Sequence, residues 1–292
     1  MNNLGPIRIG QFSESPVLAV ATALGLDKRY GVSWETSRVA SSPQQFASLR
    51  DGEIDIAVTS PDNVLLYATT DKNPLSGRLA LRMLRPIDRG LGLALYTRPE
   101  ISGANDFNGA TLGVDVMSSG FALLLLSMLR LIGVDPKDVS FEARGATPMR
   151  VKAIKSGEIA GSILNAESAV EAESSGFSRW ATSVDVSSDY LGTVLVQLDT
   201  GVSDVAESFL QMWEEATQTI LNSTPESVIE LFQRTAPQLS QDHYVGLVQS
   251  SEFGLISGRE ITMEQLLTLA QIRSDAGSYT PAEADIAKLL AR

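Results

Sequence analysis

Three times in its first 61 residues the chain passes from a strand-like segment into Ser-Pro and then into a helical pattern. The pairs are Ser15-Pro16, Ser42-Pro43 and Ser60-Pro61. Serine favours the N-cap of a helix and proline its first position, so each pair predicts a helix that begins at the carboxyl end of a strand. Ligands of α/β sheets bind at those strand ends, where free backbone N–H groups favour anionic or strongly polar molecules. The opening segment therefore predicts a binding cleft.

A purely structural interpretation of these pairs stays open. Thr224-Pro225 and Thr280-Pro281 also begin helical patterns, and no strand precedes either of them. A hydroxyl residue followed by proline is thus the ordinary helix start of this chain. The functional interpretation of each pair depends on the strand before it.

The composition excludes several classes of function. The 292 residues carry a net charge of −12, which argues against nucleic acid or an anionic membrane as partner. Cysteine is absent and His243 is the single histidine, so disulfides, thiolate chemistry and multi-histidine metal sites are excluded. The most apolar stretch, residues 121–133, is too short to span a membrane and predicts a buried helix. We therefore expect no cofactor, no metal site and no insertion into a membrane.

The first residues leave the compartment open. Residues 1–6 lead into the first predicted strand without the basic and apolar regions of an export signal. One alternative is that a signal peptide was removed, which would place the protein in the periplasm or at the cell surface. The other alternative is a protein that stays in the cytoplasm.

Strand and helix patterns alternate along the first two thirds of the chain. This alternation predicts βαβ units and mainly parallel sheets. Extended segments at 90–96 and 191–198 predict two crossings that join the lobes as a hinge. We therefore expect an α/β fold in which residues 1–91 and 197–292 form a discontinuous first lobe and residues 92–196 a second. The expected strands are 7–11, 32–39, 54–59, 79–86, 111–116, 139–143, 161–164 and 179–184.

Several stretches resemble type II periplasmic binding proteins of the nitrate, sulfonate and taurine class and their thiamine-pyrimidine-precursor relatives. These stretches are residues 42–63, 90–91, 98–101, 109–114 and 152–159. The resemblance implies two α/β lobes, each a mainly parallel sheet flanked by helices, that close over a small solute for delivery to an ABC transporter permease. The yeast-type pyrimidine synthases on this fold use a histidine and a cysteine-rich motif, so the lack of cysteine argues against that activity.

The resemblance also implies where the ligand binds, namely at the turns that follow the strands of both lobes. The matching positions are Gln11, Phe12, Ser13, Glu14, Ser42, Thr59, Ser60, Asp62, Ser118, Ser119, Phe121, Thr147, Asn165 and Glu167. Asp62 and Glu167 also suit the first turn of a helix for the sake of the dipole alone. Arg89 and Arg144 lie near the hinge and on a turn of the second lobe, where an arginine can bind a carboxylate, sulfonate or phosphate bidentately.

Two functions from different classes follow from these observations. The first is a solute-binding protein that performs no chemistry and captures a small polar or anionic organic molecule, without catalytic residues. The alternative is a cytoplasmic enzyme on the same fold, of the decarboxylase, dehydratase or hydrolase type. It would use Glu14, Asp62, Asp115 and Glu167 as acids and bases, provided that burial tuned their pKa values.

Overall fold

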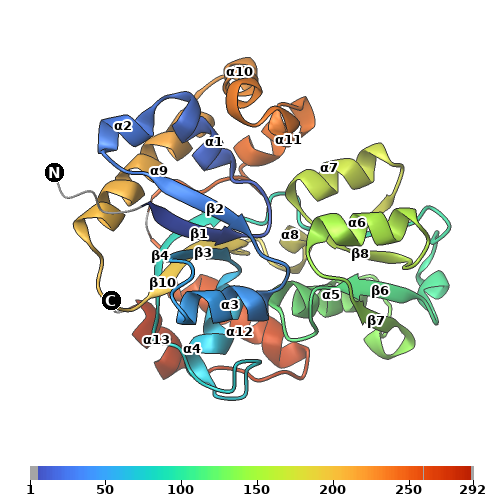
Figure 1. Ribbon diagram of the computed structural model, residues 1–292. Helices are drawn as coiled ribbons and strands as arrows, with labels where there is room; N and C mark the ends of the chain where they lie inside the picture. Colours follow the sequence, from blue (N-terminus) through green and yellow to red (C-terminus); the bar gives the residue numbers. More distant parts are fainter. Residues whose placement is uncertain (1–5, 259, 291–292) are drawn as a thin grey trace.

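Two five-stranded mixed sheets form the two halves of the structure, a computed structural model that describes residues 6–258 and 260–290 (Figure 1). The strand order is β2-β1-β3-β10-β4 in the first sheet and β7-β6-β8-β5-β9 in the second. Helices flank both sheets, which confirms the expected two-lobed α/β fold. The question of an export signal concerns residues 1–5, which lie outside the described residues.

The two sheets share one arrangement of strands. In the first sheet β1 runs parallel to β2 and β3, while β10 runs antiparallel to β3 and β4. In the second sheet β6 runs parallel to β7 and β8, while β5 runs antiparallel to β8 and β9. The strands of the first sheet are β1 (Ile7–Gln11), β2 (Trp34–Arg38), β3 (Ile56–Thr59), β4 (Leu81–Asp88) and β10 (Thr193–Leu198). Those of the second are β5 (Ala94–Thr97), β6 (Thr111–Val114), β7 (Ser140–Ala143), β8 (Gly161–Leu164) and β9 (Ser178–Thr182).

The C-terminal third is helical and covers both faces of the first sheet (Figure 1). On one face, α9 packs on α1 and buries Trp213 in the apolar core. On the other face, α12 and α13 pack near α4, where the rings of Phe46 and Tyr67 stack at 4.1 Å. The helices of this lobe are α1 (Pro16–Ala23), α2 (Leu26–Tyr30), α3 (Ser42–Arg50), α4 (Pro61–Thr69), α9 (Asp204–Asn222), α10 (Pro225–Thr235), α11 (Asp242–Gln249), α12 (Met263–Asp275) and α13 (Glu283–Leu290), with the 3₁₀ turn η3 (Pro237–Leu239).

The second lobe is smaller and contains the apolar helix that the sequence predicts. This helix, α5, buries most of its leucines in the core between the sheets and the C-terminal helices. A short helix, α8, replaces the expected end of the ninth strand, because Thr182 and Asp185 form a capping box there. The helices of this lobe are α5 (Gly120–Leu131), α6 (Thr147–Lys155), α7 (Ala166–Ser174) and α8 (Ser183–Val186), with the 3₁₀ turns η1 (Ala104–Phe107) and η2 (Pro136–Asp138).

Residues 89–93 and 187–192 carry the chain between the two sheets. The crossings lie side by side, because the N–H of Gly192 donates to the carbonyl of Asp88 at 2.8 Å. All of β10 pairs within the first sheet. We therefore propose that the second lobe spans about residues 92–192, so that the first lobe resumes at Thr193, four residues before the expected 197.

Three of the helices begin at the serines that the sequence singles out. Ser15, Ser60 and Ser119 cap α1, α4 and α5, and each side chain accepts a hydrogen bond from a backbone N–H of the first turn. The prediction for Ser42 is wrong by one residue, since Ser41 caps α3 and Ser42 is its first residue. Ser41 is the cap residue because its backbone is extended and its hydroxyl accepts a hydrogen bond from the N–H of Gln44.

Candidate functional site

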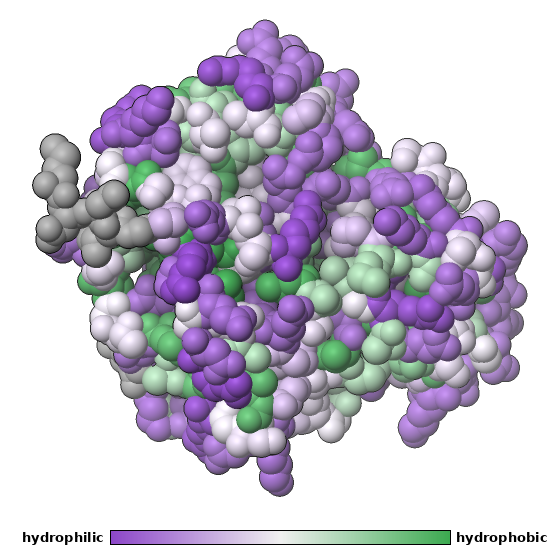
Figure 2. Space-filling model, in the orientation of Figure 1, coloured by the Kyte–Doolittle hydropathy of each residue, from purple (hydrophilic) through white to green (hydrophobic). Residues whose placement is uncertain are grey.

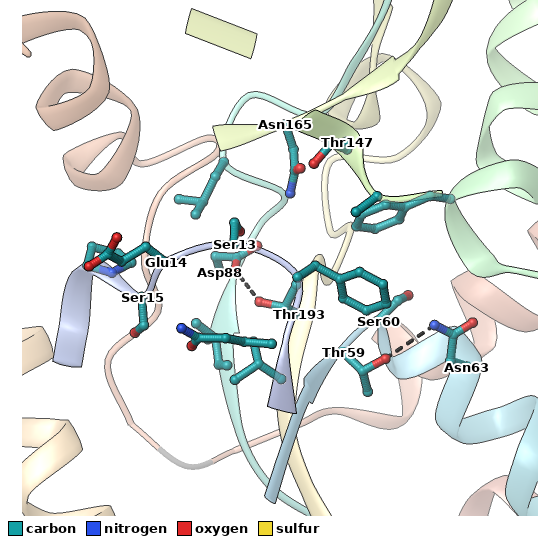
Figure 3. A pocket seen from close by; sticks show the side chains of 18 of the residues that line it. Ser13, Glu14, Ser15, Thr59, Ser60, Asn63, Asp88, Thr147, Asn165 and Thr193 are labelled. Carbon is teal, nitrogen blue, oxygen red and sulfur yellow. Dashed lines mark hydrogen bonds between the residues drawn. The ribbon is translucent and has the colours of Figure 1, made fainter. Parts of the chain in front are cut away.

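A cavity of about 90 Å³ lies between the two lobes, at the carboxyl ends of strands from both sheets. Asn165 and Thr147 face it from the second lobe, opposite Ser13, Thr59 and Ser60 of the first (Figure 3). The sequence-predicted residues that line it are Gln11, Phe12, Ser13, Glu14, Thr59, Ser60, Ser119, Phe121, Thr147 and Asn165. The structure thus brings turns from both lobes together at one place. Their contact with a ligand stays a prediction.

The amino-terminal ends of five helices, α1, α4, α5, α6 and α7, meet at this cavity, the last of them through its cap residue Asn165. The caps of α1, α4 and α5 line it with their serines, and Thr147, the first residue of α6, lines it as well. Free N–H groups and the positive ends of the helix dipoles therefore face the same small volume. The Thr147 hydroxyl is not a helix cap, since Ala146 precedes it as the cap residue.

The cavity contains one buried cation among the described residues that line it, namely Arg150 of α6. Its guanidinium donates to the carbonyls of Gly145 and Ile163, and its Nε is buried without a hydrogen-bond partner. Burial lowers the pKa of Arg150 to about 10, and the negative charge of Asp115 opposes that shift. Arg150 is therefore charged at neutral pH, and its Nε–H is a hydrogen-bond donor without an acceptor.

Carboxylates line the cavity too. Asp115 accepts hydrogen bonds from the hydroxyls of Ser119 and Ser42, the second at 3.3 Å. Asp88, at the end of β4, accepts from the N–H of Gly90 at 2.7 Å and from the hydroxyl of Thr193 (Figure 3). Burial raises the pKa of Asp88 to about 6, although these two hydrogen bonds lower it.

Asn63 and Gln11 add amide groups to the wall. The Nδ2 of Asn63 donates to the hydroxyl of Thr59 at 3.2 Å (Figure 3). The Oε1 of Gln11 is buried and has no hydrogen-bond partner. Asn63, Asp88, Arg150 and Thr193 are residues that sequence reasoning missed. Thr193 and Asp88 lie at strand ends rather than at helix starts, and Arg150 lies inside a helix, so no turn signal marks them.

The remaining sequence-predicted residues do not line the cavity. Asp62 forms a buried ion pair with Arg273 of α12 at 2.6 Å; burial raises the pKa of Asp62, while Arg273 opposes the rise. Ser42 faces Asp115 instead. Ser118, Arg89, Arg144 and Glu167 also lie outside the lining.

Two arginines outside the cavity lining, Arg144 and the buried Arg85, have carboxylate partners. Arg144 pairs with Glu142 and with Glu158, both at 2.6 Å, and Arg85 of β4 pairs with Glu214 at 2.9 Å. Glu167 lines a neighbouring pocket between α7 and α11, where burial raises its pKa.

Neither a metal cluster nor a membrane span is found among residues 6–258 and 260–290. No group of three or more histidine, cysteine, aspartate or glutamate residues there could hold a metal ion. None of the helices in these ranges is both long and apolar enough to cross a bilayer. The hydrophilic and hydrophobic residues are mixed over the face that Figure 2 shows.

No protein-family model and no curated protein matches the sequence. Solved structures do match. The alkanesulfonate-binding protein SsuA from Xanthomonas axonopodis pv. citri is 14% identical over 98% of both chains, with a TM-score of 0.75. The periplasmic nitrate-binding protein NrtA from Synechocystis is 13% identical, with a TM-score of 0.76, over 97% of this chain and 84% of that one.

A third match is the ligand-binding component of an ABC-type import system from Staphylococcus aureus, determined with zinc bound. It is 16% identical over 97% of this chain and 96% of that one, with a TM-score of 0.72. At sequence identities this low, the structural similarity establishes the fold and does not identify the ligand. The chain therefore has the two-lobed α/β fold of the periplasmic binding proteins, as the resemblance in its sequence implies.

Proposed function

We propose that this protein is a solute-binding protein that captures a small polar or anionic organic molecule between its lobes. The observation that supports this most directly is the inter-lobe cavity, which five helix starts line together with Arg150, a residue whose buried Nε has no hydrogen-bond partner. Buried polar atoms without partners are rare in proteins and are satisfied when a ligand supplies the missing group. The neighbours on this fold include binding proteins for alkanesulfonate and nitrate.

The partner of such a protein would be the permease of an ABC transporter, since one structural neighbour is the ligand-binding component of an ABC import system. This role would place the protein in the periplasm or at the cell surface. An export signal in the complete gene product, tested by secretion of the full-length protein, is the observation on which this location depends.

A cytoplasmic enzyme on the same fold has weaker support. Of its proposed acids and bases, Asp62 is held in an ion pair with Arg273, and Glu167 lies outside the cavity. Asp115 accepts two serine hydroxyls. Glu14 lines the cavity but also accepts a hydrogen bond from Gln238.

A thermal-shift screen with carboxylates, sulfonates, amino acids and pyrimidines, followed by calorimetry, tests the proposal. A ligand at about 100 times its dissociation constant should raise the free energy of unfolding by about 2.7 kcal/mol. Thr147→Val removes a cavity hydroxyl that caps no helix, and should weaken binding by about 0.5–1.5 kcal/mol. Failure of every compound to bind, or conversion of a bound compound to product, would count against a binding protein.

A further inference from the structure

The charged side chains around the cavity do not balance. The described lining contains Glu14, Asp88, Asp115 and Arg150. Glu14 has Arg38 at 4.0 Å, and Asp115 interacts with the charge of Arg150. Within the described ranges, no arginine, lysine or histidine lies within ion-pair distance of Asp88. The carboxylate of Asp88 is therefore the group without a counter-charge.

Water does not replace the missing counter-charge of Asp88, because the residue is only 2% exposed. Its two hydrogen bonds come from neutral donors, the N–H of Gly90 and the hydroxyl of Thr193. Burying a carboxylate with neutral donors alone is unfavourable unless a cation reaches it. A cationic group of the ligand would supply that charge from inside the cavity.

Arg150, by contrast, is a buried positive charge that requires a negative group nearby; it is also 2% exposed. Its Nε–H lacks an acceptor, and its charge is only partly matched by Asp115, with which it forms no ion pair within 4.0 Å among the described residues. The hydroxyls of Ser60, Ser119 and Thr147 line the same cavity. Together with the helix starts, these donors suit a carboxylate or another small anionic group.

We propose that the ligand is a small zwitterion, with an ammonium group at Asp88 and an anionic group at Arg150. This inference rests on the proposed solute-binding function. A simple anion would leave Asp88 without a counter-charge and be repelled by it, and a simple amine would leave the charge of Arg150 only partly matched. The Oε1 of Gln11, buried in the same cavity without a partner, offers a second acceptor for the ammonium.

Matched compounds that differ by one charged group test this proposal on the unmodified protein. The zwitterions are the α-amino acids, β-alanine and γ-aminobutyrate; the anions are acetate, propionate and butyrate; the amines are methylamine, ethylamine and propylamine. Calorimetry at pH 7.5 should show that the best zwitterion binds about ten- to a hundredfold more tightly than its matched anion and amine.

Two variants separate the charge of Asp88 from its hydrogen bonds. Asp88→Asn keeps the shape of the side chain and removes the charge, and it should abolish the preference for the zwitterion over the matched anion. Thr193→Val removes the hydroxyl that donates to Asp88 but keeps the carboxylate, and the preference should persist. Circular dichroism and the melting temperature show whether each variant is folded.

The outcomes distinguish a failure of the zwitterion proposal from a failure of the proposed solute-binding function. If an anion binds as tightly as its zwitterionic match, or if only compounds outside the zwitterion set bind, the inference is wrong and the binding function stands. If Asp88→Asn is folded and retains the preference, Asp88 does not hold the ammonium. If no compound of these sets and none of the thermal-shift screen binds, both the inference and the proposed function fail.

Discussion

Arg150 lines the cavity from within α6, three residues after the helix begins. Turn and helix-start signals in the sequence therefore do not mark it. The guanidinium returns toward the start of α6, where the carbonyl of Gly145 accepts from it, and the carbonyl of Ile163 in β8 accepts at 3.1 Å. Two backbone acceptors therefore fix the orientation of the side chain. The Nε is buried without a hydrogen-bond partner.

We predict that Arg150→Lys weakens the binding of the ligand found in the screen by about 1.5–3 kcal/mol, because lysine keeps the charge but cannot reproduce the planar fork of donors. Calorimetry measures the change. Arg144→Ala is the matched control, because Arg144 lies on the same side of the cleft but pairs with Glu142 and Glu158 outside the cavity. Equal affinities of the Arg150 variant and the control would contradict the assignment.

The titration of Asp88 gives a second prediction at this scale. Its pKa in the folded protein is raised to about 6 by burial, so the folded state binds a proton more tightly than the unfolded state. The stabilisation is complete below the unfolded pKa and is lost as the pH rises through about 6.

We therefore expect Asp88→Asn to gain stability relative to the parent as the pH rises from 4 to 7, by up to about 3 kcal/mol. Urea denaturation at intervals across this range measures the difference. A difference in unfolding free energy that stays constant between pH 4 and 7 would show that Asp88 titrates as an exposed carboxyl group does.

Among the elements, the start of α5 touches the start of α4 across the lobes. The N–H of Gly120 donates to the Oδ1 of Asn63 at 3.3 Å. A Cβ added at Gly120 would lie 2.6 Å from the Cβ of Asp62 and 2.9 Å from the hydroxyl of Ser60. The lobes can therefore approach this closely only because residue 120 lacks a side chain.

We predict that Gly120→Ala holds the lobes apart and lowers ligand affinity about tenfold or more, since the bound state needs both walls of the cavity. Small-angle scattering of the liganded variant should show a larger radius of gyration than the parent. Gly246→Ala is the control, because Gly246 lies within α11 with no atom within 4 Å of the added Cβ, and it should leave affinity unchanged. A compact liganded Gly120 variant with parental affinity would refute this.

How far the sequence could predict the elements depends on local signals. The strands Ile7–Gln11 and Gly161–Leu164 have the predicted bounds, because apolar runs with polar turns on both sides mark them. Hydroxyl caps likewise located three cavity-lining helix starts. Asp88 and Thr193 could not be paired from the sequence, because 105 positions separate them and only the sheet brings β4 beside β10.

At the scale of the whole molecule, a buried ion pair ties the C-terminal part of the first lobe to its amino-terminal part. Arg273 of α12 and Asp62 of α4 are each almost fully buried, and their atoms are 2.6 Å apart. Arg273 also donates to the carbonyl of Tyr279 at 2.8 Å. Helix α12 is thus anchored to α4, whose cap residue Ser60 lines the cavity.

We predict that Arg273→Met lowers the free energy of unfolding by about 3–5 kcal/mol, because it leaves the Asp62 carboxylate buried without its partner. Adding Asp62→Asn should restore part of the loss. Urea denaturation compares both variants with Lys155→Ala, which breaks the exposed pair with Glu171 and should change stability little. A loss no larger than that of the Lys155 control would mean that the pair is not structurally important.

The position of β10 has a consequence for the order in which the protein is made. β10 lies between β3 and β4, and it is the only described strand that β4 pairs with in its sheet. Every strand of the second lobe lies within residues 94–182, so a growing chain can complete that sheet first. Until residue 198 leaves the ribosome, β3 and β4 lack the strand that pairs with both of them, and the backbone N–H and C=O groups on those edges stay unpaired. The first sheet, four of whose strands are synthesised before the second lobe, can therefore be completed only after the second lobe, and until then its open edges can pair with other chains.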